Sequence, residues 1–394
     1  MTATLVSRPP FDPKQPFDVP PLLRGQVPIE AWESTAVLRA SIKANTALAA
    51  LKEAAALLPN PDVMLSSLVL LESKASSEIE NIVTSTDTLF EYAAHDDARM
   101  AKADAAVKET LRYRESLHHG VAQMRSRPLA TTLIEEICSL TKGMEMRVRK
   151  VPGTALINSH TGETIYTPPQ GEAMLREKLA DWEIFCHAEA SDEARGGELD
   201  ALIRMAVLHY QFEAIHPFLD GNGRTGRVLN LLFLMEKGLL NSPVLYLSRY
   251  ILRHRSRYYA LLLAVSRDGH TQAWEQWLLY MLEAVRETAQ WTLAKIKAIA
   301  RLMEQSHAEI QRDTKLGNQK GLVELIFRLP YCRVADVVQA QIAKRQTASV
   351  YLQTLASTGL LQMREQGREK LYFNHRLIDL LKNEASGDED LVGA

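Results

Sequence analysis

Apolar residues recur at intervals of three and four along most of this chain, which is the spacing of one face of an α-helix. From Ala31 onward the pattern predicts helices over 32–58, 62–73 and 75–92, with a turn at Asn60-Pro61-Asp62 between the first two. Prolines that break helices recur between residues 1 and 28, so an irregular arm is predicted there. The helical spacing continues through the middle of the chain, over 97–120, 128–142, 171–187, 198–215, 223–238, 249–267, 271–288 and 290–312.

Two regions depart from this helical spacing. The segments 154–158 and 164–167 read as short strands of a hairpin that ends at Pro168-Pro169. After a linker at 314–319, the pattern predicts a small final domain with an order of elements that resembles a winged helix. Its predicted helices are 320–328, 333–339 and 345–357, and its predicted strands are 360–363 and 371–373.

The composition is that of a globular protein with no overall attraction to nucleic acid or to an anionic membrane. The chain has 394 residues, 46% hydrophobic and 24% charged, with a net charge of −2, so two or three domains are expected. Cys138, Cys186 and Cys332 lie far apart, and neither they nor the histidines show metal-ligand spacing, which predicts reduced thiols. The N-terminus lacks an apolar signal core, and no apolar run approaches the roughly 20 residues of a membrane span. A soluble cytoplasmic protein is therefore expected.

The densest chemistry lies in one loop, whose sequence is His216-Pro217-Phe218-Leu219-Asp220-Gly221-Asn222-Gly223-Arg224-Thr225-Gly226-Arg227. The residue before a proline disfavours the helical region, so the chain should leave the preceding helix at His216. Gly221 and Gly223 allow main-chain N–H groups to approach an anion. The next helix points its unpaired N–H groups and the positive end of its dipole at the same place. Together these features predict a phosphate-binding loop.

Three charged side chains add to this loop. Arg224 and Arg227 are three residues apart in the first turn of the next helix, so their guanidinium groups lie near one face and can hold phosphate oxygens. Asp220 offers a hard oxygen ligand beside the phosphates, which suits Mg²⁺. A lone His-Pro pair or Gly-x-Gly turn is usually structural. Their combination with two arginines and a carboxylate favours a catalytic nucleotide site.

At every defined position the loop is similar to the Fic family signature, His-x-Phe-x-Asp/Glu-Gly-Asn-Gly-Arg-x-x-Arg. The resemblance covers about residues 30–290. It implies an all-α Fic core with a small β-hairpin flap, which transfers AMP from ATP to a Ser, Thr or Tyr hydroxyl of a target protein. It implies that His216 is the general base on that hydroxyl. For the rest of the signature it implies Mg²⁺ on Asp220, phosphate stabilisation by Asn222 with the Gly221 and Gly223 amides, and orientation of the β- and γ-phosphates by Arg224 and Arg227.

Known variants of the family sharpen the expected reaction. The related death-on-curing kinases lack the second glycine and the last arginine, and they bind the nucleotide reversed. Gly223 and Arg227 are both present here, which favours AMP transfer over phosphate transfer. Tyr258 resembles the family residue that lines the adenine pocket, although Tyr258 and Tyr259 also fit an ordinary core.

An upstream stretch resembles the inhibitory motif of autoinhibited Fic proteins, Ser/Thr-x-x-x-Glu-Gly/Asn. Here it reads Ser76-Ser77-Glu78-Ile79-Glu80-Asn81, with Ser76 and Glu80 one helical turn apart. The resemblance implies that Glu80 pairs with Arg227 and denies it to the γ-phosphate. The alternative interpretation is a surface acid on an amphipathic helix.

The hairpin at 154–168 resembles the flap of the family, a strand edge beside the active site. Such an edge can dock an extended segment of the target protein through main-chain hydrogen bonds. In the family, flap main chain at the positions of Thr164, Ile165 and Tyr166 also faces the nucleotide. The alternative is an ordinary protected hairpin.

The C-terminal region leaves a second class of function open. Residues 331–376 hold seven Lys/Arg against three acids, so a DNA-binding regulator with a nucleotide-sensing Fic site is the alternative to an enzyme. Removal of AMP at the same site is a further alternative, and the family layout implies a homodimer. The predicted domains are an N-terminal helical region over 1–95, with an inhibitory helix at about 75–92, a Fic core over 96–313, and a winged-helix-like domain over 314–394.

Overall fold

The computed structural model describes residues 10–23, 26–56, 61–93, 103–158, 161–195, 197–366 and 369–383. The chain forms two compact units. Unit 1 comprises Met1–Ala49, Ala75–Ile82 and Arg112–Ala289, and unit 2 comprises Ala50–Lys74, Val83–Leu111 and Gln290–Ala394. The predictions for Asn60, His160, Arg368 and the acidic tail from Glu384 fall outside the described residues.

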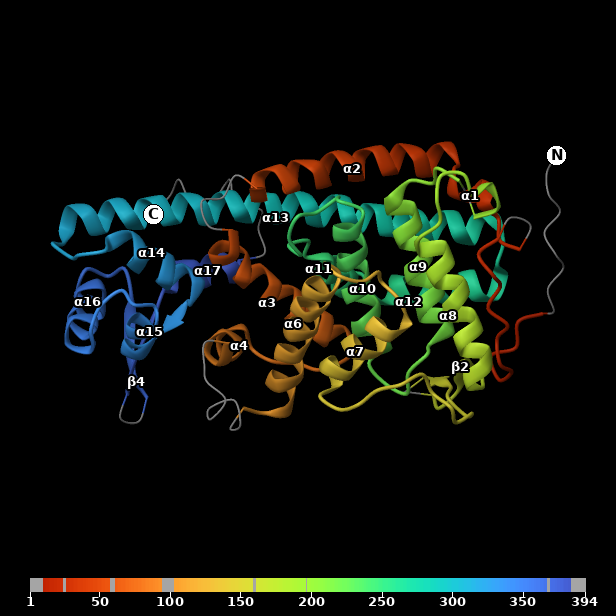
Figure 1. Ribbon diagram of the computed structural model, residues 1–394, viewed down its shortest axis with the longest axis horizontal. Helices are drawn as coiled ribbons and strands as arrows, with labels where there is room; N and C mark the ends of the chain where they lie inside the picture. The colour runs from red at the N-terminus through yellow and green to blue at the C-terminus, as the bar shows by residue number, and fades with distance from the viewer. Residues whose placement is uncertain are drawn as a thin grey trace. The chain divides into compact units, whose positions relative to one another are not determined.

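A buried helix, α9 (Ala201–Ile215), is the centre of unit 1. It packs against α8 (Glu172–Cys186) and α10 (Asn222–Glu236), and α10 in turn packs against α7 (Thr131–Lys142) (Figure 1). Because α9 is apolar on nearly every side, it is stable only inside such a layer. The Asp200 side chain caps its start by accepting hydrogen bonds from the amides of Leu202 and Ile203.

Shorter elements complete unit 1. They are α1 (Ile29–Trp32), the 3₁₀ turn η1 (Glu193–Arg195), α11 (Leu247–Arg253), α12 (Arg255–Asp268) and the antiparallel hairpin of β1 (Leu156–Ile157) and β2 (Thr164–Tyr166). Four helices contribute residues to both units: α2 (Thr35–Ala56), α3 (Pro61–Ile79), α6 (Ala105–Gln123) and α13 (Thr271–Asp313).

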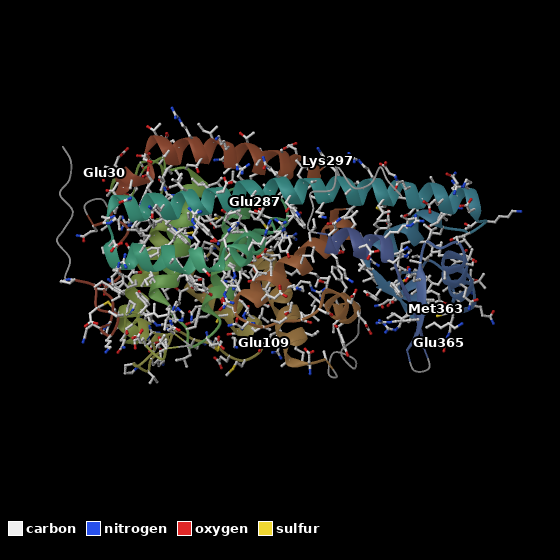
Figure 2. All side chains as sticks on the ribbon, turned by 180° about the vertical axis from the view of Figure 1, so that it is seen from behind. Glu30, Glu109, Glu287, Lys297, Met363 and Glu365 are labelled. Carbon is white, nitrogen blue, oxygen red and sulfur yellow. The ribbon has the colours of Figure 1, made fainter. Side chains whose placement is uncertain are left out.

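Unit 2 holds α4 (Thr86–Ala93) and a C-terminal group of small elements. In chain order these are α14 (Gln319–Arg328), β3 (Tyr331–Cys332), α15 (Val334–Gln339), α16 (Arg345–Ser357), β4 (Gln362–Gln366), β5 (Glu369–Phe373) and α17 (His375–Lys382). The strands form an antiparallel sheet in the order β3-β5-β4. Met363 and Glu365 lie on the exposed part of β4 (Figure 2).

The predicted fold class, mostly helical with small β-hairpins, is confirmed, but several boundaries differ. The predicted helix 75–92 does not form. Instead α3 continues to Ile79, Asn81 adopts a left-handed φ of 61°, and α4 begins anew where Ser85 Oγ accepts from the Thr88 amide at 3.0 Å. The predicted helix 249–267 breaks at His254 into α11 and α12.

At three further points the sequence prediction missed a feature. The segments 271–288 and 290–312 form one helix, α13, because no glycine or proline interrupts residues 271–313. The two-residue strand β3 is too short to show a pattern, and α17 follows directly after β5, where Asn374 caps it. Among the described helices, none combines the length and apolar character needed to cross a membrane.

Candidate active site

The signature loop joins the end of α9 to the start of α10. The chain leaves α9 at His216, which is left-handed with φ 49° and ψ 59°, and its amide donates to the Phe212 carbonyl at 3.0 Å. Gly221, the N-cap of α10, has φ 85°, a conformation that other residues rarely adopt. A Cβ atom there would also lie 3.2 Å from Cγ and Cδ of Lys142. The predicted exit from the helix at His216 is confirmed.

Asn222 braces this loop from inside. Its Oδ1 accepts from the Phe218 amide at 2.9 Å, and its Nδ2 donates to the Phe218 carbonyl at 2.8 Å. Phe218 itself is fully buried and packs near Phe212. The Asn222 side chain therefore fixes the shape of the loop around Phe218.

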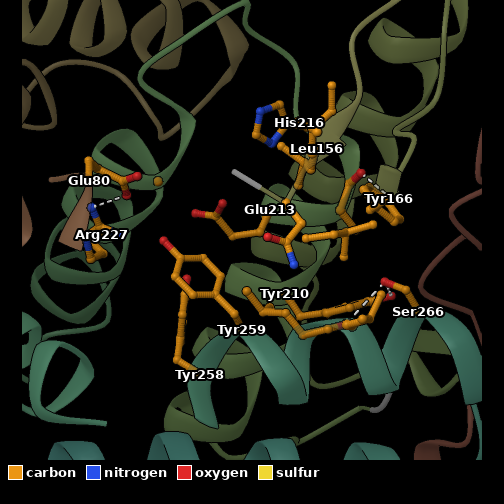
Figure 3. A pocket seen from close by; sticks show the side chains of 17 residues that line it. Glu80, Leu156, Tyr166, Tyr210, Glu213, His216, Arg227, Tyr258, Tyr259 and Ser266 are labelled. Atoms are coloured by element: carbon orange, nitrogen blue, oxygen red, sulfur yellow. Dashed lines mark hydrogen bonds and ion pairs between the residues drawn. The ribbon is translucent and has the colours of Figure 1, made fainter. Parts of the chain in front are cut away.

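A cavity of about 420 Å³ opens beside the loop in unit 1 (Figure 3). One end is charged, where Arg227 and Glu80 meet, and the other is formed by aromatic rings and aliphatic side chains. Its volume falls in the range of small-molecule sites. Lining residues come from the flap (Leu156, Ile157, Asn158, Ile165, Tyr166), from α9 (Tyr210, Glu213, Ala214), from α12 (Tyr258, Tyr259, Leu262, Leu263, Ser266) and from the loop end (Glu80, His216, Gly223, Arg227).

Three tyrosine hydroxyls of the cavity wall are held by hydrogen bonds to other residues of unit 1. Tyr166 donates to the Ala214 carbonyl at 2.7 Å, and Tyr258 lies 2.8 Å from Nε2 of His209. Tyr210 pairs with the Ser266 hydroxyl at 3.0 Å. These bonds fix the rings, so their apolar surfaces are available to a flat ligand such as a nucleotide base.

Arg227 closes the charged end through contacts with the end of α3. Its Nε donates to Ser76 Oγ, and its Nη2 donates to the Ser76 carbonyl and to Glu80 Oε1, each at 2.8 Å. Arg227 is 1% exposed. Burial alone would lower the pKa of Arg227, but Glu80, with smaller effects of Tyr258, Tyr259 and Glu213, raises it above its ordinary value. A further contact, from Arg255 Nη1 to Asn81 Oδ1 at 2.9 Å, holds the turn after Glu80.

Two titratable side chains that line the cavity, His216 and Glu213, have pKa values shifted in opposite directions. Burial, assisted by the charge of Arg149, lowers the pKa of His216 to about 4. Burial raises the pKa of Glu213 to about 8. At neutral pH the imidazole is therefore uncharged and able to accept a proton, while the carboxyl is mostly protonated.

Asp220 lies at the mouth of the loop with its side chain 65% exposed. Its Oδ1 accepts from the Gly221 amide, and its Oδ2 pairs with Lys142 Nζ at 2.6 Å. Burial raises the pKa of Asp220, but the hydrogen bond and charge of Lys142, the Gly221 amide and the charge of Arg224 together outweigh this, and the net pKa is lowered. The group is thus an ionised, accessible carboxylate beside the amides of a helix N-terminus, a donor type that fits Mg²⁺.

The sequence-predicted residues divide into two groups in the structure. The first group lines the cavity and comprises Ile165, Tyr166, His216, Gly223, Arg227, Tyr258 and Glu80. Ser76 does not line the cavity but accepts a hydrogen bond from Arg227. Thr164, Asp220, Gly221, Asn222 and Arg224 do not line it.

Sequence reasoning missed Glu213 and Tyr210, three and six residues before His216. The spacing of one helix face could have indicated both.

A second cluster of polar side chains lies at the opposite end of α10, about 20 Å along the helix from the loop. One ligand-type atom from each of Cys186, His187 and Glu236 lies within 4.8 Å of the other two, which the sequence spacing did not indicate. His187 Nε2 lies 2.9 Å from the Leu129 carbonyl, and Nδ1 lies 3.8 Å from Glu236 Oε1. Burial raises the pKa of the Cys186 thiol, so the sulfur is protonated in this arrangement.

Three stretches match known families. Residues 129–234 match the Fic/DOC family, residues 38–122 match the Fic/DOC family N-terminal region, and residues 302–377 match the C-terminal domain of the protein adenylyltransferase SoFic-like group. The last of these matches covers α14 to β5 of unit 2.

Curated relatives match over parts of the chain. A probable protein adenylyltransferase of Aquifex aeolicus is 45% identical over 53 residues, 14% of this chain and 17% of that protein. Protein adenylyltransferase fic-1 of Caenorhabditis elegans is 41% identical over 99 residues, 25% of this chain and 17% of its own length. Protein adenylyltransferase Fic of Drosophila willistoni is 28% identical over 160 residues, 41% and 28% of the two chains. The chain thus spans less than a third of the length of these relatives.

A solved structure shows the same fold over most of the chain. The Fic family protein from Desulfovibrio desulfuricans G20 superposes with a TM-score of 0.51 at 14% identity, covering 86% of this chain and 96% of that chain.

Proposed function

Because this chain belongs to the Fic/DOC family, we propose that it is a protein adenylyltransferase, which moves AMP from ATP to a hydroxyl group of a target protein. The observation that carries the proposal is the cavity itself. Its lining includes an uncharged imidazole, His216, a buried arginine, Arg227, and several aromatic rings, which supports a nucleotide as the ligand.

The reaction would run as follows. The target hydroxyl, a Ser, Thr or Tyr side chain, attacks the α-phosphorus of ATP and gives its proton to His216. The bond from the α-phosphorus to the oxygen bridging to the β-phosphorus breaks, and pyrophosphate leaves with that electron pair. The amides at Gly221 and Gly223, together with Arg224 and Arg227, would hold the phosphates, and Tyr258 would line the base pocket.

Asp220 would hold the Mg²⁺ that accompanies ATP, since it is an ionised and exposed carboxylate at the edge of the phosphate loop. When bound there, the cation supplies charge neutralisation for the phosphates. The chain's own part is to present the Asp220 carboxylate, whose Oδ2 lies 2.6 Å from Lys142 Nζ.

We further propose that Glu80 inhibits the enzyme by engaging Arg227. The 2.8 Å contact is a charge-assisted hydrogen bond between a buried guanidinium and a carboxylate, and it uses the donor that would otherwise meet the γ-phosphate. Gly223 supports this interpretation, because a Cβ there would lie 2.3 Å from Glu80 Oε1. The glycine leaves the space that Glu80 occupies.

The target protein would dock on the flap at 154–168. Leu156 and Ile157 of β1 are exposed, and both line the cavity, so a segment paired with this hairpin would lie beside the α-phosphate site. Thr164, Ile165 and Tyr166 of β2 would face the nucleotide from the same hairpin.

Two radiolabelled forms of ATP test the reaction class. In the Glu80→Gly variant, α-labelled ATP should label protein and γ-labelled ATP should not, because only the AMP moiety is transferred. His216→Ala in the same background should abolish labelling while leaving ATP binding intact. Labelling from the γ-position would identify a phosphotransferase and refute AMP transfer.

A DNA-binding regulator remains the alternative from another class, resting on the basic stretch 331–376. In unit 2, however, Arg364 pairs with Glu91, Arg376 pairs with Glu309 at 2.9 Å, and Arg333 is buried. These three arginines are paired or buried within unit 2, whereas Lys344, Arg345 and Lys370 of the same stretch are exposed, so the alternative needs a direct test. A gel shift with random duplex DNA at two salt concentrations tests the alternative.

Assembly and the reverse reaction complete the proposal. A homodimer is predicted from the family layout, and light scattering of the purified chain would test it. Removal of AMP from a modified target would use the same cavity, with Glu80 orienting a water molecule. Loss of label from an AMP-modified target on incubation with wild type, but not with Glu80→Gly, would support that activity.

A further inference from the structure

Arg149 is a buried arginine that ties together three separate stretches of unit 1. It lies in the segment between α7 and β1 and is 2% exposed. Its Nε donates to the His216 carbonyl at 3.0 Å, and its Nη2 donates to the Pro169 carbonyl at the end of the flap. Its own amide donates to the Pro217 carbonyl at 2.9 Å. Consecutive carbonyls of the catalytic loop, at residues 216 and 217, are thus both held by one residue.

Arg149 holds the main chain at a position where it is strained. A left-handed conformation at a residue other than glycine costs on the order of 1 kcal/mol and persists only when surrounding contacts enforce it. His216 has this conformation, with φ 49°. Because Arg149 holds the carbonyls of both His216 and Pro217, it restricts the rotation that would let His216 relax. The direction of the imidazole depends on this backbone.

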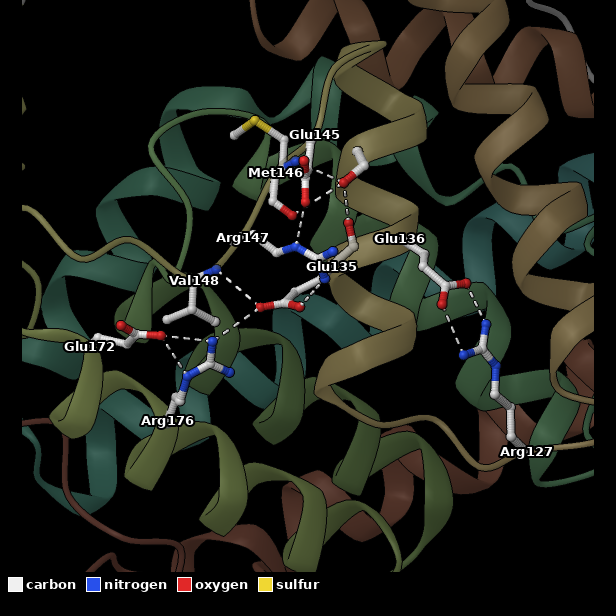
Figure 4. Close-up of polar contacts among 10 residues, drawn as sticks. Arg127, Glu135, Glu136, Glu145, Met146, Arg147, Val148, Glu172 and Arg176 are labelled. Atoms are coloured by element: carbon white, nitrogen blue, oxygen red, sulfur yellow. Dashed lines mark hydrogen bonds and ion pairs between the residues drawn. The ribbon is translucent and has the colours of Figure 1, made fainter.

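The segment that carries Arg149 is itself fixed to α7 (Figure 4). Glu135 accepts from the Val148 amide at 3.2 Å and from Arg147 Nη1 at 2.9 Å. Ser139 Oγ accepts from the Met146 amide at 2.8 Å and lies 3.2 Å from the Met146 carbonyl. The Arg149 side chain therefore extends to the loop from a rigid base, as a positioning group must.

The charge of Arg149 has a separate effect on the histidine. Among the described residues, no carboxylate pairs with Arg149, and its buried Nη1 has no hydrogen-bond partner. An unpaired buried cation is costly, and a neutral donor would satisfy carbonyl groups at lower cost. After burial, the charge of Arg149 is the next contributor that lowers the pKa of His216.

We propose that Arg149 is the positioning residue of the catalytic histidine, holding the strained His216 main chain in the conformation that proton transfer requires. This proposal rests on the proposed function of His216 as general base. It assigns to Arg149 no contact with ATP or with the target, only an action through His216 and the end of the flap.

The test uses the Glu80→Gly enzyme, so that turnover is measurable, and compares Arg149→Gln with Arg149→Lys. Glutamine keeps a donor and removes the charge, whereas lysine keeps the charge. We expect the kcat of Arg149→Gln to fall about 100-fold, the scale of a small misplacement of a reacting group. Its KM for ATP should change less than threefold. We expect Arg149→Lys to recover part of the loss.

A titration of labelled histidine by NMR gives the readout that a merely structural role would not move. In Arg149→Gln the pKa of His216 should rise by a measurable amount, and in Arg149→Lys it should stay near the parent value. The matched control is Arg204→Gln, which removes another buried arginine bonded to main-chain carbonyls, those of Phe185 at 2.7 Å and Gly197 at 3.1 Å. We expect Arg204→Gln to lower stability while leaving kcat and the His216 titration unchanged.

The outcomes separate this proposal from the proposed function. A folded Arg149→Gln enzyme with kcat within threefold of its parent and an unmoved His216 titration would overturn the role of Arg149. A raised KM with unchanged kcat would also overturn it, because Arg149 would then act in nucleotide binding. If His216→Ala retains AMP transfer, the proposed function fails instead, whatever the Arg149 variants do. Should Arg149→Gln not fold, Arg149→Lys and its titration decide the question alone.

Discussion

Arg227 Nη2 lies 2.8 Å from Glu80 Oε1, although 147 residues separate the two along the chain. The pair is asymmetric, because the arginine side chain is 1% exposed and the glutamate side chain is 32% exposed. Ser76 adds two bonds to the same guanidinium, through its hydroxyl and its carbonyl. Glu80 can therefore leave toward solvent while Arg227 stays fixed, which is the geometry expected of a removable block.

We predict that Glu80→Gly raises AMP transfer. Hydrogen bonds to charged groups contribute about 1.5–3 kcal/mol, so freeing Arg227 should increase labelling from α-labelled ATP by about ten- to a hundredfold. The Ser76 contacts should keep the guanidinium in place for the γ-phosphate. The measurement is the initial rate of self-labelling and of labelling in cell extract. Equal rates in wild type and variant would show that Glu80 does not restrain the enzyme.

The matched control for that variant is Glu80→Gln, which preserves the shape of the side chain and removes its charge. A glutamine still occupies the space beside Gly223 but binds Arg227 less strongly, so the labelling rate should lie between those of wild type and Glu80→Gly. A rate equal to that of wild type would mean that the block is steric rather than electrostatic.

The loop could be interpreted from the sequence because its chemistry is local. His216, Gly221, Gly223 and Arg227 lie within 12 residues, and helix ends have fixed geometry, so the site was predictable before any long-range contact was known. The position of Ser76 and Glu80 was predictable only through the resemblance to the family, because no local rule connects residues so far apart.

Other parts of the site had no comparable signal. Arg149 acts through the main-chain carbonyls of residues 169 and 216. The direction of a carbonyl group cannot be predicted from the types of side chain in a sequence. The helix α3 continues past residue 74, where no glycine or proline interrupts it, and it ends just before Asn81, which is left-handed. Tertiary contacts decide the bonds of Arg149, and a single sequence does not show them.

We predict that His209 makes the stability of the protein fall in acid. Burial lowers the pKa of His209 in the folded state to about 3, whereas the unfolded chain titrates near 6.5. Because the folded pKa is depressed, the contribution is present above pH 6.5 and is lost as the pH falls toward 3. At pH 5 the loss should approach about 2 kcal/mol.

The measurement is urea unfolding of wild type and His209→Gln at pH 7 and pH 5. The change in the free energy of unfolding should be smaller in the variant, and taking the difference cancels groups common to both proteins, such as Glu213. His209 also bonds the Tyr258 hydroxyl at 2.8 Å, so the variant should be less stable at pH 7 as well. The same pH dependence in both proteins would contradict a buried, uncharged His209.

We predict that Lys142 competes with divalent cations for Asp220. Its ammonium group already occupies Oδ2 at 2.6 Å, and a cation at this carboxylate must displace it or share the oxygen. Since Asp220 is well exposed, the pair is worth at most about 1 kcal/mol. Lys142→Met should therefore tighten the binding of Mn²⁺ in the presence of ATP by about two- to fivefold.

Electron paramagnetic resonance of free Mn²⁺, measured in a His216→Ala background, reads this binding without turnover. Lys150→Met is the control, because Lys150 is an exposed lysine in the same region that pairs with Glu172 instead. Asp220→Asn should weaken Mn²⁺ binding whether Lys142 or Met is present at position 142. Weaker binding in Lys142→Met would show that the lysine supports the cation or the phosphates rather than competing with them.

The family signature leaves position 226 undefined, but a side chain there would press on three residues of α9. A Cβ atom on Gly226 would lie 2.6 Å from Glu213 Oε1, 3.1 Å from Phe212 and 3.3 Å from His209. All three neighbours are on α9, and Glu213 and His209 support the cavity, so the strain of an added methyl would act on the site. We predict that Gly226→Ala destabilises the protein by about 1–3 kcal/mol, the usual effect of overpacking, and weakens ATP binding.

In Gly226→Ala combined with Glu213→Ala, the carboxyl is gone and part of the stability should return, which urea unfolding measures. If the double variant is no more stable than the sum of the single changes predicts, the contact between Gly226 and Glu213 does not limit this site.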